Sequence, residues 1–205
     1  MTLPRPELLV VTDRTQAQAP LEDVLNAVFI AGCRWASVRE KDLPDAEQVA
    51  LARRLYEFAG HYGARLTLHG RAELAEEAGV DGVHLPGGAD ARAARALLGR
   101  RALIGISVHT PEEASALDAS ILDYAIAGPA YASASKPHYG PVLGMVGIEK
   151  IVNATRVPII AIGGIAPGVV AEMWVAGAAG VAVMGSIMRA KDLGAVVQRL
   201  VREFE

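Results

Sequence analysis

The sequence predicts a (β/α)8 TIM barrel, an α/β fold in which eight parallel strands alternate with helices. Eight short apolar runs recur along the 205 residues, and the segments between them show helical periodicity. Such alternation implies parallel strand pairing through right-handed crossovers. One small barrel accounts for the whole chain, so we expect a single domain covering residues 1–205.

The apolar runs define the expected strands, in chain order. They are residues 8–12, 35–39, 65–69, 82–85, 102–107, 123–128, 157–164 and 180–185. In the intervening segment AEQVALARRLYEFAG, the apolar residues fall on roughly one face of a helix. Pro167 and Gly177 mark the start and the end of another expected helix.

A doubly wound open sheet is the competing fold for a chain of alternating strands and helices. That fold usually carries a glycine-rich turn, G-x-G-x-x-G, directly after its first strand. Here the first strand runs into TDRTQAQAP, which contains no glycine. The barrel is therefore the favoured interpretation.

The composition excludes several classes of function. The net charge is -3 at pH 7 and no basic stripe occurs, so a nucleic-acid partner is not expected. The single cysteine, Cys33, rules out an internal disulfide and fits a reducing compartment, as an inert buried thiol. No charged-then-apolar leader and no apolar run of about 18 residues occurs, so we expect no membrane segment and a cytoplasmic location.

Polar and glycine residues cluster where the expected strands end. In a barrel, the loops after the carboxyl ends of the strands hold the active site. The candidate positions are Asp13-Arg14, Arg39-Glu40-Lys41, His69-Gly70, Leu85-Pro86, Ser107-Val108-His109, Gly128-Pro129, Gly163-Gly164 and Gly185-Ser186.

Glycines end the seventh and eighth expected strands, in AIGGIAP and VMGSI. In many barrels the loops at these two places bind a phosphate, because glycines let backbone N–H groups approach the anion and a helix dipole favours it. Gly163, Gly164, Gly185 and Ser186 are therefore the predicted phosphate-binding residues.

Two cations flank Glu40 after the second expected strand. Because side chains alternate along an extended segment, Arg39 and Lys41 are expected to share one side. Arginine can grip a carboxylate through two hydrogen bonds, so the pair suits an anionic substrate. A solvated run of charges is the alternative.

Several segments together resemble the thiamine phosphate synthase and TenI group of barrels. They are LLVVTDR, SVREKDLP, LHGRAELAEEAGVDGVHLP, IGISVHTPEEA, DYAIAGPAYASASKPHYGPVLG and VPIIAIGGIAPGVVAEMWVAGAAGVAVMGSI, in the same order as in the family. The resemblance covers nearly the whole chain and implies a barrel that acts on a thiazole phosphate in thiamine biosynthesis. It also suggests a homodimer.

Three positions differ from the synthases of this group. Those enzymes join a pyrimidine diphosphate to a thiazole phosphate and hold Mg²⁺ on the departing pyrophosphate, which requires hard oxygen ligands. Their Asn-Asp pair after strand three is His69-Gly70 here, and their Asp after strand four is Ala89, one residue before Asp90. Their Gln before the REK motif is Ser37. A metal-binding role is therefore not expected.

The TenI branch offers the main functional expectation. Its members resemble the synthases but lack the metal carboxylates, and they show the glycine and the Leu-Pro found here in HGR and HLP. They act as thiazole tautomerases, which need a general acid and base but no metal. We therefore expect a metal-independent isomerase, although Pro129 follows Gly128 where the tautomerases carry a histidine.

The proton-transfer group must then be another residue. His69 and His109 end strands and can face the mouth, and His138 lies in a long loop that can close over a substrate. Ser107 is an expected substrate contact. Ser133, Ser135 and Lys136 occupy the place where the synthases bind pyrophosphate.

Two other functions stay open. The first is a divergent thiamine phosphate synthase that recruits Asp90 or Asp13 to hold Mg²⁺. The second is a regulatory barrel that binds a phosphate ligand and has lost catalysis.

Overall fold

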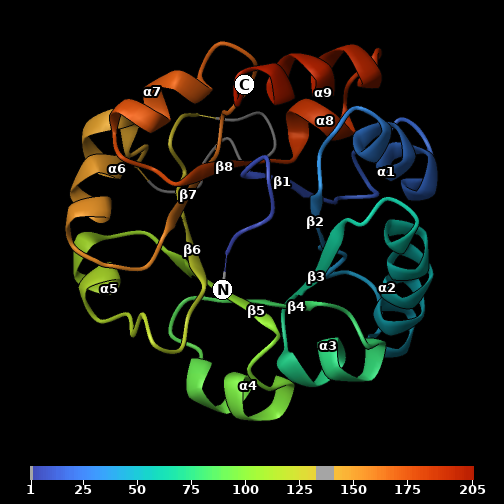
Figure 1. Cartoon of the computed structure of the whole chain (residues 1–205), viewed down its shortest axis with the longest axis horizontal. Helices are drawn as coiled ribbons and strands as arrows, with labels where there is room; N and C mark the ends of the chain where they lie inside the picture. Colours follow the sequence, from blue (N-terminus) through green and yellow to red (C-terminus); the bar gives the residue numbers. More distant parts are fainter. Residues whose placement is uncertain (1, 133–140) are drawn as a thin grey trace.

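Eight parallel strands close into a barrel in sequence order in the computed structural model, which describes residues 2–132 and 141–205 (Figure 1). The strands are β1 (Leu8–Val11), β2 (Trp35–Val38), β3 (Arg65–His69), β4 (Gly82–Leu85), β5 (Leu103–Val108), β6 (Tyr124–Ala127), β7 (Ile159–Ile162) and β8 (Gly180–Val183). Pairing of Leu8 with Val181 joins β1 to β8 and closes the sheet. The predicted fold class is confirmed.

Helices follow the strands and form the outer layer of the molecule (Figure 1). They are α1 (Leu21–Ile30), α2 (Asp45–Gly60), α3 (Ala72–Ala78), α4 (Ala91–Leu98), α5 (Pro111–Ser115), α6 (Gly144–Asn153), α7 (Val170–Val175), α8 (Gly185–Met188) and α9 (Leu193–Arg202). No helix in the described ranges is both long and apolar enough to cross a membrane.

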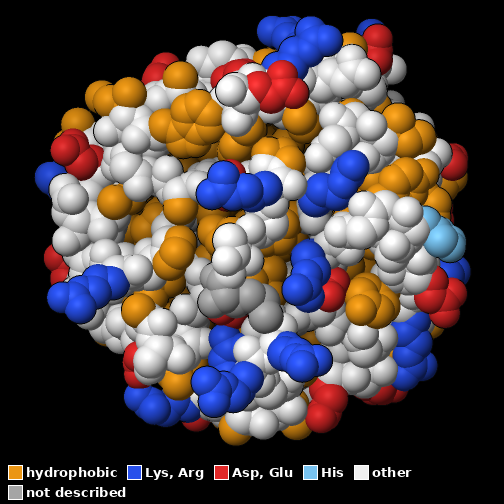
Figure 2. Space-filling model, in the orientation of Figure 1, with side chains coloured by type: hydrophobic (Ala, Val, Ile, Leu, Met, Phe, Trp, Pro, Cys, Tyr) orange, Lys and Arg blue, Asp and Glu red, His pale blue; other side chains and the backbone are white. Residues whose placement is uncertain are grey.

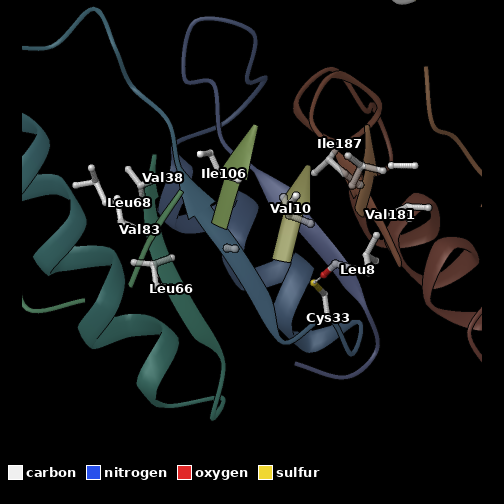
Figure 3. Close-up of a cluster of buried hydrophobic side chains, with 14 of the residues drawn as sticks. Leu8, Val10, Cys33, Val38, Leu66, Leu68, Val83, Ile106, Val181 and Ile187 are labelled. Carbon is white, nitrogen blue, oxygen red and sulfur yellow. Dashed lines mark hydrogen bonds between the residues drawn. The ribbon is translucent and has the colours of Figure 1, made fainter. Parts of the chain in front are cut away.

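Alternation along the strands divides the apolar core into two parts. Leu8 and Val10 face outward and pack against the helices, in a cluster of which Figure 3 shows one region. Cys33 belongs to this cluster, and its thiol donates to the backbone oxygen of Leu8 at 3.2 Å. Burial raises the pKa of the Cys33 thiol to about 11, which fits an inert structural cysteine.

A second cluster fills the inside of the barrel. Leu9 and Val11 project into it, together with Trp35, Tyr124 and residues of β5 to β8. The rings of Trp35 and Tyr124 meet edge to face, with centroids 4.8 Å apart. These side chains close the barrel below its mouth, so a ligand can enter only the upper part of the interior.

Two strands end two residues earlier than the sequence predicts. The seventh expected strand extended to Gly164, but β7 ends at Ile162. Gly163 and Gly164 have φ of 100° and 66°, a left-handed conformation that ends the extended chain. The eighth ends at Val183 because α8 begins at Gly185.

The space for the Tyr124 ring depends on Gly105. A Cβ atom placed on Gly105 would lie 2.1 Å from Cζ of Tyr124. We expect Gly105→Ala to lower the free energy of unfolding by about 1–3 kcal/mol, because the ring has to shift within a packed core. Urea denaturation measures this change.

Gly60→Ala is the matched control for that substitution. Gly60 ends α2, and a Cβ atom there meets nothing within 4 Å. Alanine favours a helix over glycine by about 1 kcal/mol, so this variant should be unchanged or slightly more stable. Equal stability of the Gly105→Ala variant and the wild type would contradict the proposed packing.

Candidate active site

A cavity of about 430 Å³ opens at the carboxyl ends of the strands. Its described lining includes residues at or after the end of every strand, among them Gly128, Pro129 and Ala132 after β6. The polar side chains that line it are Arg39, Lys41, His69, His84, Ser107, His109, Ser186 and Arg189. This is the end of a barrel at which active sites occur.

A second cavity, of about 360 Å³, lies at the opposite end of the barrel. Arg5, Arg34 and Arg65 line it, and Figure 2 shows Lys and Arg side chains grouped around the centre of the face that carries the N-terminus. These guanidinium groups already have partners: Arg5 pairs with Glu7, Arg65 with Asp81, and Arg34 donates to backbone oxygens. The first cavity is therefore the candidate site.

The buried carboxylate of Glu40 positions the REK segment. Glu40 is 2% exposed and accepts hydrogen bonds from Oγ1 of Thr12 at 2.6 Å and from the backbone N–H of Arg14. Thr12 Oγ1 in turn accepts from the backbone N–H of Arg39 at 2.9 Å. Burial raises the pKa of Glu40, although these hydrogen bonds oppose the shift. The carboxylate faces β1, and the flanking cations line the cavity.

Arg39 and Lys41 therefore share one side, as the alternation of side chains predicted. Neither side chain forms an ion pair within the described part of the chain. Partial burial of the ammonium, and then the charge of Arg39, lower the pKa of Lys41. Arg39 is near enough to Asp13 for its charge to help lower the pKa of that carboxyl, after the hydrogen bonds from Thr15 and Gln16, but no salt bridge joins the two residues. Two adjacent cations outside any salt bridge in the described part of the chain make this wall of the cavity an anion-binding surface.

His84 is a structural residue at the floor of the cavity. It is fully buried, its Nε2 atom lies 2.9 Å from Oγ of Ser107, and its ring lies 4.5 Å from that of His69, its partner in the β3–β4 register. Burial, and to a smaller extent the charge of Lys41, lower the pKa of His84 to about 3. The ring is therefore neutral at physiological pH and holds Ser107 in place.

His69 and His109 both line the cavity, where the sequence places them. Nδ1 of His109 lies 2.7 Å from the backbone oxygen of Gly128. Because a carbonyl oxygen only accepts, Nδ1 of His109 carries the hydrogen. His138, Ser133, Ser135 and Lys136, also predicted site residues, lie outside the described residues.

The structure brings Gly163, Gly164, Gly185 and Ser186 together in the lining. The two glycines after β7 also make close backbone contacts. A Cβ atom on Gly164 would lie 2.6 Å from Cβ of Tyr131, so only glycine fits beside the segment after β6. Ser186 Oγ is buried and has no hydrogen-bond partner within the described ranges. These residues form a polar corner that suits a phosphate.

Arg189 lines the cavity, although the sequence did not predict it as a site residue. It follows α8 and donates a hydrogen bond to the side chain of Gln16. The signal was an arginine one turn after the GSI that ends the predicted phosphate loop. It adds a third cation to the mouth.

The residues of the mouth do not fit a carboxylate-held Mg²⁺. No Asp or Glu belongs to the described lining, and no group of three or more possible metal ligands occurs among the described residues. Asp90 caps α4 by accepting from the N–H of Ala93 at 3.0 Å. Asp13 accepts from Thr15 and Gln16. Neither aspartate belongs to the described lining of the cavity, and the hypothesis that one of them holds the metal stays a prediction.

The depressed pKa of His84 predicts a pH dependence of stability. The unfolded chain binds the proton near pH 6.5, whereas folded His84 resists it down to about 3. Stability should therefore fall as the pH decreases through this window, by roughly 1 kcal/mol per pH unit. Urea denaturation between these pH values measures the slope.

His84→Gln should remove this part of the slope. His61→Gln is the control, because His61 is exposed and its loss should leave the slope unchanged. If the His84→Gln variant kept the slope of the wild type, the pKa of His84 in the folded protein would not be lowered.

Comparison with known proteins places these features in a family. The family model described as thiamine monophosphate synthase matches residues 8–187. A thiamine biosynthesis bifunctional protein of Symbiobacterium thermophilum is 42% identical over 88% of the chain, which spans 38% of that protein. A putative thiamine-phosphate synthase of Geobacter sulfurreducens is 38% identical, with 90% of this chain and 88% of the relative covered.

A solved structure of a protein with a related name also matches this chain over nearly its whole length. The thiamine phosphate pyrophosphorylase from Pyrococcus furiosus superposes with a TM-score of 0.82 at 28% identity, covering 97% of this chain and 94% of that one. A thiamine-phosphate synthase of Moorella thermoacetica is 33% identical over 94% of the chain and 92% of its own length.

These relatives correct the functional expectation. The predicted tautomerase, an isomerase, is wrong, because the relatives that match nearly the whole chain are named as synthases, which are transferases. Missing metal carboxylates do not identify a tautomerase, because that reaction also needs a general acid and a general base. Pro129 lines the cavity where a tautomerase carries its histidine. The chain belongs to the thiamine monophosphate synthase family, the TMP-TENI group.

Proposed function

We propose that this protein is a thiamine-phosphate synthase, a transferase that joins a pyrimidine diphosphate to a thiazole phosphate and releases pyrophosphate. The names of its relatives support the reaction. The observation that carries the proposal is the anion-binding wall of Arg39 and Lys41, which faces the same cavity as the glycine loops after β7 and β8. Such a cavity suits two phosphate-bearing substrates at once.

The cations serve the departing diphosphate in this proposal. As the bond between carbon and the diphosphate oxygen breaks, the electron pair leaves with the oxygen and negative charge grows on the diphosphate. Fixed cations stabilise that charge more strongly in the transition state than in the substrate. Arg39 can bind two oxygens through its planar fork, and Lys41 acts as a compact point charge.

The glycine corner holds the thiazole phosphate. Gly164 and Gly185 leave the backbone open to the anion, and Ser186 can donate its hydroxyl hydrogen. Ser107, held by neutral His84, lines the same cavity as the two anion sites. His69 and His109 then contact the substrates through hydrogen bonds, and their assignment as site residues stays a prediction.

The cellular setting of the proposal follows the sequence. We propose a cytoplasmic enzyme that acts on small molecules, without nucleic-acid or membrane partners. A homodimer stays a prediction.

The reaction itself tests the proposal. The purified chain should release pyrophosphate from a mixture of the pyrimidine diphosphate and the thiazole phosphate. Arg39→Gln should lower kcat/KM about 100-fold, because one donor to the developing charge is lost. Arg100→Gln is the control, since Arg100 is exposed in the turn before β5, at the other end of the barrel. No release above the enzyme-free rate, with or without Mg²⁺, would refute the synthase.

The depressed pKa of Lys41 predicts how KM changes with pH. Lys41 loses its proton at a lower pH than an ordinary lysine, and the substrate diphosphate then loses a counter-charge. KM for the pyrimidine diphosphate should therefore rise as the medium becomes alkaline. Lys41→Arg should delay this rise, because arginine stays charged. A profile identical in the two proteins would remove Lys41 from diphosphate binding.

A further inference from the structure

We infer that the mouth of this barrel binds a diphosphate through protein cations alone, without a divalent cation held by the chain. The inference rests on the proposed function for the identity of the anion. It concerns how the charge of that anion is balanced, which the fold and the names of the relatives leave open. Three observations carry it.

The first observation is the chemistry of the lining. Mg²⁺ prefers oxygen ligands, above all carboxylates, and imidazole suits other metals. The described lining offers three cations, three imidazoles and two hydroxyl groups, but no carboxylate. The sequence of residues 133–140, SASKPHYG, contains no Asp or Glu. A dication placed at this mouth meets cations instead of carboxylates and is repelled.

The second observation is that nearby carboxylates are committed elsewhere. Glu40 stands between Arg39 and Lys41 in the sequence, but it is buried and bound to Thr12 and to the N–H of Arg14. Moving it into the mouth would leave these buried polar groups without hydrogen-bond partners, which is unfavourable. Glu113 accepts from the backbone N–H of His109.

The third observation is the backbone at Gly70. Its φ of 149° is a conformation that residues with a side chain rarely adopt. The N–H of Gly70 also donates to the backbone oxygen of His84 at 2.9 Å, which anchors this turn to β4. The turn after β3 is therefore built around a glycine, and a carboxylate at this position would be strained. The backbone conformation at Gly70 therefore disfavours a metal-binding side chain at this position.

Three cations take the place of the metal. Arg39, Lys41 and Arg189 line one cavity, and the first two form no salt bridge within the described ranges. Arginine and lysine can hold a diphosphate by charge-assisted hydrogen bonds without giving up any existing ion pair of these two residues. Free pyrophosphate, which retains its full negative charge, should then bind better than its magnesium complex.

Binding of sodium pyrophosphate to the whole chain tests the inference by isothermal titration calorimetry. One titration contains EDTA and the other contains excess MgCl₂. We expect binding in EDTA, with an affinity equal to or higher than that in Mg²⁺. Arg39→Gln should weaken binding in EDTA about 10-fold or more, since it removes a two-pronged charged contact. Arg100→Gln should bind like the wild type.

Three outcomes would overturn the inference. The first is binding only in Mg²⁺. The second is an affinity at least 10-fold higher in Mg²⁺ than in EDTA, which corresponds to ~1.4 kcal/mol. The third is no binding in either buffer. A direct assay adds a readout that is independent of pyrophosphate. Mn²⁺, followed by electron paramagnetic resonance, should not bind to the free chain, and saturable binding that Asp13→Asn or Asp90→Asn removes would also overturn it.

The results separate this inference from the proposed function. A chain that binds pyrophosphate in EDTA but releases none from the two substrates keeps the inference and refutes the synthase. A chain that turns over only with Mg²⁺ and binds pyrophosphate only with Mg²⁺ keeps the synthase and refutes the inference.

Discussion

The pairing of β1 with β8 is the interaction on which the site depends. It turns an open sheet into a ring, so the carboxyl ends of strands that are far apart in the sequence meet around one cavity. Arg39 after β2 and Arg189 after α8 share this cavity only because the ring is closed. The apolar plug of Trp35 and Tyr124 then limits how deep a ligand can enter. Closure and plug together determine the shape of the mouth.

Local patterns in the sequence carried most of the fold and part of the site. Strand–helix alternation predicted the order of the elements, and glycines at two strand ends predicted the corner formed by Gly164 and Gly185. The roles of Glu40 and Asp90 were not predictable, because they depend on partners. Glu40 bonds to Thr12, 28 residues away in the chain, and the two meet only when β1 and β2 pair. Asp90 caps α4 by accepting from the N–H of Ala93, a partner that is fixed only when the helix begins at Ala91.

The functional expectation failed for a different reason. Missing carboxylates at His69-Gly70 and Ala89 led to a prediction of proton-transfer chemistry, yet an absent ligand does not identify a reaction. The structure contains the cations that a diphosphate needs, and its most buried imidazole, His84, is held neutral and bonded to Ser107. The charge at the mouth is therefore a better guide to the substrate than the missing metal ligands.

The burial of Glu40 has a consequence for how a substrate arrives. The segment Arg39-Glu40-Lys41 carries one net positive charge by formal count, but its negative charge lies beneath the surface within hydrogen bonds. A molecule with a net charge of -3 therefore presents a locally positive entrance. Beyond a Debye length of about 8 Å salt screens the overall charge of the protein, and within that distance the positive entrance attracts an anion. Capture of the substrate is thus a short-range event, set by the mouth and insensitive to the overall charge of the chain.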